Sequence, residues 1–172
     1  MTSSDALDRV LQLRSNADYR GARELANAEA PTGGEGGPRP VQLLIELGRL
    51  DEEFADYPAA ASALARAAEL AGALEAAEER DVLRARALAG LAAVRRAEGR
   101  SNESDPLLAD AVALIEPHIG AAPVPSVRVL VEAGARQAEL AEHHAAQALF
   151  EQAVAAAGAA DAGPERDGAQ AQ

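Results

Sequence analysis

Residues 88–111, LAGLAAVRRAEGRSNESDPLLADA, decide the fold of this chain because their apolar pattern occurs several times. Leu88 and Leu91 are three residues apart, and a turn at 98–101 leads to a second apolar segment that ends at Ala111. Spacings of three and four residues place apolar side chains on one face of a helix. The stretch therefore predicts a helix hairpin, two antiparallel helices joined by a short turn.

The same pattern recurs on both sides of this stretch. It begins 44 residues earlier at Leu44, 42 residues later at Leu130, and more weakly at Ala6. Each of the three stronger copies has one small residue on each helix, where we expect the two helices to touch. These small residues are Gly48, Ala92, Gly134, Ala60, Ser104 and Ala146. A larger residue (Leu64, Leu108 or Phe150) should fill the space between neighbouring hairpins. One hairpin cannot bury its own apolar face, so the pattern predicts an all-α stack of about four antiparallel hairpins.

This small, large, small pattern resembles the tetratricopeptide repeat, with a period longer than the usual ~34 residues. It is similar to the longer-helix variety found in kinesin light chains and in the sensor regions of actinobacterial signalling ATPases. The chain departs from the family midway along the first helices, where Asp51, Arg95 and Gln137 replace an aromatic residue. The resemblance implies a right-handed superhelical solenoid over residues 1–157, whose concave face is made by the first helices.

Two segments lie outside the repeat. Residues 31–40, PTGGEGGPRP, are rich in helix-breaking residues and predict a flexible loop between the first and second hairpins. Residues 158–172 contain Gly, Pro and charged residues and predict a disordered tail.

The composition limits the classes of function. The formal net charge is −12, which disfavours binding to nucleic acid or to anionic membranes. There is no cysteine, so disulfides, thiol nucleophiles and thiolate metal sites are excluded. Neither a signal peptide nor a membrane-spanning stretch is recognisable, and we expect a cytoplasmic, bacterial protein.

Neither carboxylates nor histidines form a convincing catalytic or metal-binding set. Glu46, Glu52 and Glu53 share a helix face, but no nucleophile or base accompanies them, and a solvated rim is expected there. His143 and His144 are adjacent, so their side chains diverge, and we expect them to pack or cap at a turn. The sequence therefore predicts no enzyme activity, no cofactor and no bound metal.

A binding site is predicted on the first helix of the third hairpin and the start of the next. Small residues flanked by arginines would form a shallow basic trough for a carboxylate or an acidic helix of another protein. The alternative is that these arginines only solvate a helix face and pair with nearby glutamates. The predicted partner-binding residues are Arg86, Ala89, Gly90, Ala93, Arg96 and Arg128.

The sequence thus indicates a non-catalytic scaffold or adaptor that binds a peptide or helix of a partner protein on its concave face. Two alternatives remain open. One is a self-assembling module, a homodimer in which Phe150 and Val154 of an uncapped last hairpin pack against a second subunit. The other is a small-molecule or enzyme-accessory role.

Overall fold

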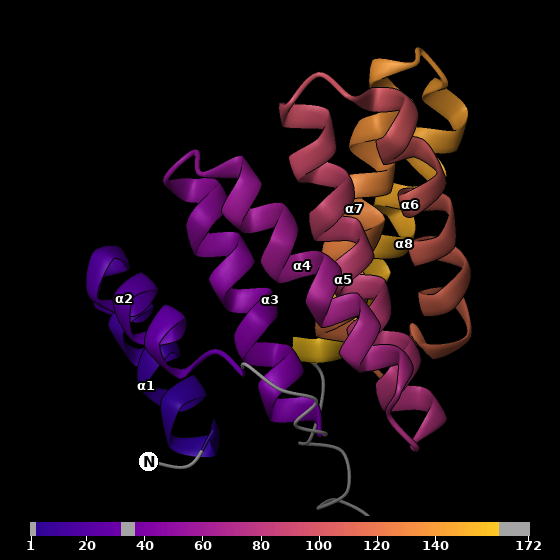
Figure 1. The fold of residues 1–172 in the computed structure, drawn as a ribbon. Helices are drawn as coiled ribbons and strands as arrows, with labels where there is room; N and C mark the ends of the chain where they lie inside the picture. Colours follow the sequence, from indigo (N-terminus) through magenta and orange to yellow (C-terminus); the bar gives the residue numbers. More distant parts are fainter. Residues whose placement is uncertain (1–2, 32–36, 162–172) are drawn as a thin grey trace, which may run out of the picture.

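A computed structural model describes residues 3–31 and 37–161, which are helical almost throughout and contain no strand (Figure 1). The all-α prediction is confirmed. The helices are α1 Ser3–Ser15, α2 Tyr19–Glu29, α3 Pro38–Glu53, α4 Tyr57–Gly72, α5 Ala77–Ala97, α6 Ser101–Ile115, the short 3₁₀ helix η1 Glu116–His118, α7 Pro123–Glu139 and α8 His143–Asp161. None of the described helices carries an apolar stretch of the length that a membrane span requires.

The four hairpins share one turn conformation. In each turn one residue has a positive φ of 57–77°, and the next amide donates to the carbonyl five residues earlier at 2.8–2.9 Å. This is the helix-ending pattern in which one left-handed residue lets the chain satisfy the last carbonyls. The left-handed residues are Ala17, Ala55, Gly99 and Ala141. They follow one another at intervals of 38, 44 and 42 residues, which equal the offsets between the four copies in the sequence.

The turn residues provide a prediction about stability. Ala55→Gly should raise the free energy of unfolding by about 0.5–1 kcal/mol, because the left-handed conformation costs an alanine about 1–2 kcal/mol and glycine almost nothing. Gly99→Ala should lower it by about 1 kcal/mol. A Cβ at Gly99 would meet no atom within 4 Å, so the backbone alone would cause the loss. Urea unfolding measures both changes, and shifts of equal sign would contradict the expectation.

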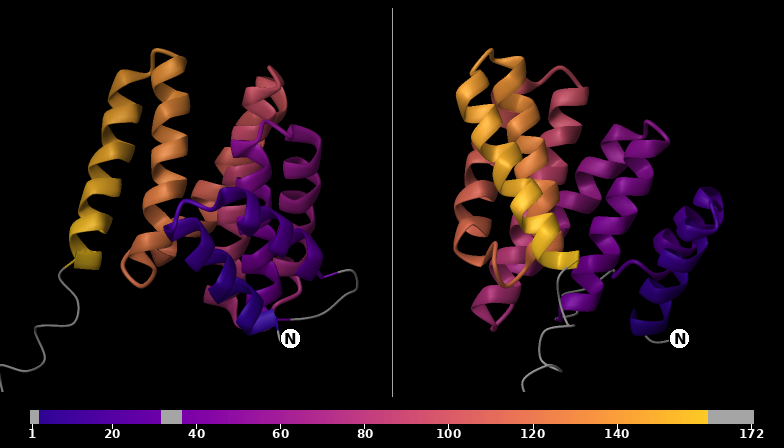
Figure 2. Two further views of the ribbon diagram at one scale, coloured as in Figure 1. Left: turned by 90° about the vertical axis from the view of Figure 1, so that its left-hand side faces the viewer. Right: turned by 180° about the vertical axis from the view of Figure 1, so that it is seen from behind.

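The helices form two layers. Each hairpin packs its two helices together, and α1, α3, α5 and α7 also contact one another in that order (Figures 1 and 2). Each second helix is covered by the first helix of the next hairpin, as α2 is by α3, α4 by α5 and α6 by α7. This packing of consecutive helices is consistent with the predicted stack of hairpins.

Small residues lie where helices meet, as predicted. A Cβ on Gly48 would lie 2.5 Å from the Cγ of Leu64, and a Cβ on Gly134 would lie 2.7 Å from the Phe150 ring. Ala60, Ser104 and Ala146 are all buried. Leu64 also packs toward Gly90 of the next hairpin, because a Cβ added to Gly90 would lie 3.0 Å from the Leu64 Cδ2 atom. Leu64 therefore fills the space between two hairpins.

Two predicted boundaries are wrong. Helix α3 already begins at Pro38, within the segment 31–40 expected to be a loop, because proline is well suited to the first turn of a helix. Helix α8 continues to Asp161, beyond the expected end at residue 157, because its last residues are mostly alanine. Residues 32–36 and 162–172, the rest of the predicted loop and tail, lie outside the described residues.

Candidate protein-binding site

The centre of the candidate site is the carboxylate of Glu46 on α3. Arg14 of α1 donates to its Oε2 atom, and Arg49, one turn along α3, donates to its Oε1 atom at 3.3 Å. Arg86 of α5 places its Nη2 atom 3.6 Å from the same Oε1 atom. The Glu46 side chain is buried, because α1 and α5 flank α3 on this layer. The solvated rim predicted for this residue is therefore wrong.

A second carboxylate and a fourth arginine extend the site. Arg128 of α7 lies 3.8 Å from Glu52 of α3, measured from Nη2 to Oε2. We call the six residues the inner cluster: Arg14, Glu46, Arg49, Glu52, Arg86 and Arg128. Its four guanidinium groups and two carboxylates leave a surplus of two positive charges, on a chain whose net charge is −12. The adjacent Arg96, Glu132 and Glu139 add one positive and two negative charges, so the surplus of the wider group of nine residues is one.

The arginines of the inner cluster act on one another. Burial lowers the pKa of Arg86, and the charge of Arg128 lowers it further against the opposing effect of Glu46. Burial also lowers the pKa of Arg49, as do the charges of Arg128 and Arg14. Positive charge is therefore crowded in partly buried surroundings, and an additional anion would relieve the repulsion.

The site also contains donors that the protein leaves without an acceptor. The Arg14 Nε atom is buried and has no hydrogen-bond partner among the described residues, and the same holds for the Arg96 Nη1 atom. Arg96 is next to the inner cluster and pairs through its other nitrogens with Glu132 at 3.0 Å and Glu139 at 3.5 Å. An unsatisfied buried donor costs about 1–3 kcal/mol. Both nitrogens are enclosed by the protein, so they mark a costly arrangement of charged groups at this site.

The predicted trough is only partly brought together. Two of its three arginines, Arg86 and Arg128, belong to the inner cluster, and the third, Arg96, lies outside it. All three are paired with glutamates, as the alternative interpretation anticipated. The small residues Ala89, Gly90 and Ala93 are buried, so they cannot provide an open floor. Their face of α5 packs against neighbouring helices, with Ala89 in a core cluster with residues of α6 and α7, and Gly90 against Leu64.

Sequence reasoning missed the centre of the site, although a signal was present. Arg86 and Arg128 occupy the same position in successive copies of the repeat, and Glu46 occupies the position four residues further on in the second copy. Arg86 thus reaches the glutamate of the preceding hairpin. In the third copy Gly90 stands at the position of Glu46, because Leu64 fills the space that a side chain would need. Arg128 therefore has no equivalent partner and lies at 3.8 Å from Glu52.

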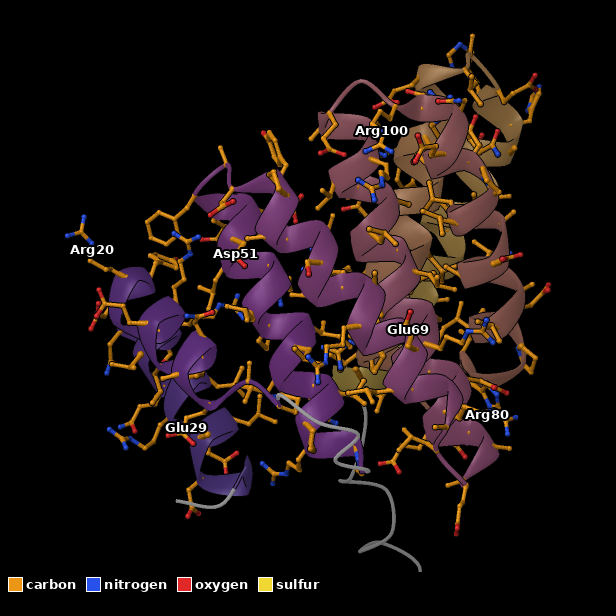
Figure 3. All side chains as sticks on the ribbon, in the orientation of Figure 1. Arg20, Glu29, Asp51, Glu69, Arg80 and Arg100 are labelled. Carbon is orange, nitrogen blue, oxygen red and sulfur yellow. The ribbon has the colours of Figure 1, made fainter. Side chains whose placement is uncertain are left out.

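Other arginines form ion pairs between neighbouring hairpins. Arg23 of α2 donates at 2.5 Å to Asp51 and at 2.5 Å to Asp56, and its guanidinium lies 5.3 Å from the ring centroid of Phe54. Figure 3 shows Asp51 on the side of α3 that faces the first hairpin. Arg136 of α7 forms two hydrogen bonds with Asp105 of α6, at 2.6 and 3.0 Å. The guanidinium groups of Arg23 and Arg136 are hydrogen-bonded to carboxylates of a neighbouring hairpin. We therefore assign these two arginines to the contacts between hairpins.

Comparison with known proteins adds no assignment. No protein-family model matches the chain, and no curated protein matches it. The function must therefore be argued from the geometry.

Within the described ranges, no group of three or more histidine or carboxylate side chains is arranged to hold a metal ion. His143 and His144, at the start of α8, are both exposed, so a packing role is not realised.

Proposed function

We propose that this chain is a non-catalytic adaptor that binds a carboxylate-bearing segment of another protein at the inner cluster. The observation that carries the proposal is the surplus of two positive charges among partly buried arginines on an otherwise acidic protein. Repeated hairpins with one shared turn support a tetratricopeptide-like, right-handed solenoid as the scaffold, with the inner cluster on the layer of first helices.

The chemistry of the cluster favours a carboxylate ligand. A guanidinium group presents a planar fork of donors that matches a carboxylate, and such charge-assisted bonds are stronger than neutral ones. Arg128 is the most exposed arginine of the inner cluster, since a third of its side chain is exposed, and its ion pair with Glu52 is long. Arg86 and Arg49 would add to the positive potential at Arg128, since the charge of Arg128 acts on both of them.

A neighbouring pocket favours a peptide over a small anion. Arg86 also lines a shallow pocket of about 390 Å³. Its other lining residues are polar or acidic (Gln42, Glu78 and Glu79) and apolar (Ala76, Val82, Leu83, Ala122 and Pro125). A carboxylate at the cluster and a small apolar side chain in this pocket could therefore belong to one ligand. The C-terminal residue of a partner protein, or an acidic residue beside an apolar one, has both groups.

The test is binding of fluorescent peptides from a C-terminal library, each compared with its amidated form. We expect peptides with a free carboxylate to bind and amidation to weaken binding at least about tenfold, since a hydrogen bond to a charged group is worth about 1.5–3 kcal/mol. Arg128→Glu should weaken binding by at least a similar factor. It is preferred to Arg86→Glu because the partner of Arg128, Glu52, is partly exposed, whereas Arg86→Glu would place a second carboxylate beside the buried Glu46.

The control is Arg84→Glu, which makes the same change in charge at an exposed position of α5. It should leave peptide affinity nearly unchanged. Both variants should keep the circular dichroism spectrum and the melting temperature of the parent protein. Equal affinity of free and amidated peptides, or equal loss in the two variants, would contradict binding at the inner cluster.

A further inference from the structure

The ion pair between Glu52 and Arg128 joins two helices that are not neighbours. Helices α3 and α7 each pack against α5, and among the described helices they form no packed pair with each other. The ion pair therefore bridges across α5 on the layer of first helices, where the proposed ligand binds. The side chains of Glu52 and Arg128 are 29% and 33% exposed, so a ligand from solution can reach both.

This contact is looser than the ion pairs between neighbouring hairpins. The Arg128 Nη2 atom is 3.8 Å from the Glu52 Oε2 atom, whereas Arg136 contacts Asp105 at 2.6 Å. Neither Glu52 nor Arg128 forms a hydrogen bond with any other residue in the ranges that the structure describes. A ligand is not tied to the backbone of α3, so its carboxylate can approach Arg128 to about 2.7–2.9 Å, the length of a charge-assisted hydrogen bond. Exchange of Glu52 for the ligand therefore gains hydrogen bonds.

We propose that Glu52 is an internal competitor for the carboxylate of the ligand. It faces Arg128 in the free protein, and the ligand displaces it on binding. This role rests on the proposed function, because it concerns the same ligand at the same arginine. Glu52 thus sets the affinity of the site without holding the ligand itself.

The surroundings of Glu52 make this competition depend on pH. Burial raises the pKa of Glu52, and the charge of Glu132 on α7 raises it further. Three arginines oppose this rise: Arg128 of α7, Arg49 of α3 and Arg96 of α5. Because the net shift is upward, Glu52 takes up a proton at a higher pH than an ordinary glutamate. A terminal carboxylate of the ligand has a pKa of about 3.3–3.7 and stays ionised, so affinity should rise as the pH falls from about 7 to about 5.

Calorimetric titration of the whole chain with one peptide tests this role. The peptide is the tightest free-carboxylate binder of the library that has an acetylated N-terminus and no acidic or histidine side chain. The Glu52→Gln variant should bind it at least about threefold more tightly at neutral pH, because the competing charge is removed and a partly exposed ion pair contributes only modestly. Between about pH 7 and about pH 5, the affinity of this variant should change less than that of the parent protein.

Glu53→Gln is the matched control, since it removes one negative charge at the next residue, which is exposed at the end of α3. It should keep the affinity and the pH profile of the parent protein, and both variants should keep its circular dichroism spectrum.

Carboxylate-dependent binding that Glu52→Gln leaves unchanged or weakens would overturn the role of Glu52 and leave the proposed function standing. An equal gain in Glu53→Gln would do the same. So would an affinity of the parent protein that does not rise as the pH falls, a measurement that needs no variant. If the amidated peptide binds as tightly as the free acid, the proposed function fails as well.

Discussion

Glu46→Gln should lower the free energy of unfolding by about 3–5 kcal/mol, the cost of removing one partner from a buried ion pair. Three arginines from α1, α3 and α5 converge on this one buried carboxylate. Without it, Arg14, Arg49 and Arg86 would face one another in surroundings that already lower the pKa of two of them. Urea unfolding followed by circular dichroism measures the change.

The control for this prediction is Glu53→Gln. Glu53 is the last residue of the same helix and is exposed, so its neutralisation should change stability by no more than about 0.5 kcal/mol. If the two variants are equally stable, Glu46 does not hold the three helices together, and the inner cluster is only a set of weak surface pairs.

Gly48→Ala should destabilise the protein by about 1–3 kcal/mol, although alanine is the better helix former. The added Cβ would lie 2.5 Å from the Leu64 Cγ atom. Leu64 is fully buried between two hairpins, so its side chain cannot move away from the added methyl group without displacing its neighbours. Gly72→Ala is the matched control in α4, because a Cβ there meets no atom within 4 Å. It should stabilise the protein by up to about 1 kcal/mol.

The two substitutions are chemically identical, but Gly48 lies inside α3 against Leu64, whereas Gly72 is the exposed last residue of α4. Thermal or urea unfolding should therefore give shifts of opposite sign. Shifts of the same sign would mean that helix propensity, and not the contact between helices, explains the glycine at position 48.

The sequence alone predicted the hairpins and their register. The positions of the helices follow from apolar residues that recur three and four residues apart. This spacing is a local property and can be read along the chain. The four turns are also local, and their left-handed residues fall at the offsets of the four copies in the sequence. The small residues at the contacts were identified for the same reason, since Gly48 and Gly134 recur at equivalent positions. Helix ends were less accurate, because Pro38 and Gly158 are tolerated near the end of a helix.

Only the tertiary structure decided which charged residues form a site. Arg14 and Glu46 are 32 residues apart, and Arg86 and Arg128 come from two further helices, so their meeting depends on how the hairpins pack. A carboxylate at the surface and one buried between arginines look the same in a sequence, as the rim expected at Glu46 illustrates. Likewise, the spacing of Ala89, Gly90 and Ala93 places them on one face of α5, which we expected to be exposed. The packing of α5 against its neighbours buries this face. Spacing along a helix determines which residues share a face, whereas burial of that face is determined by the helices that cover it.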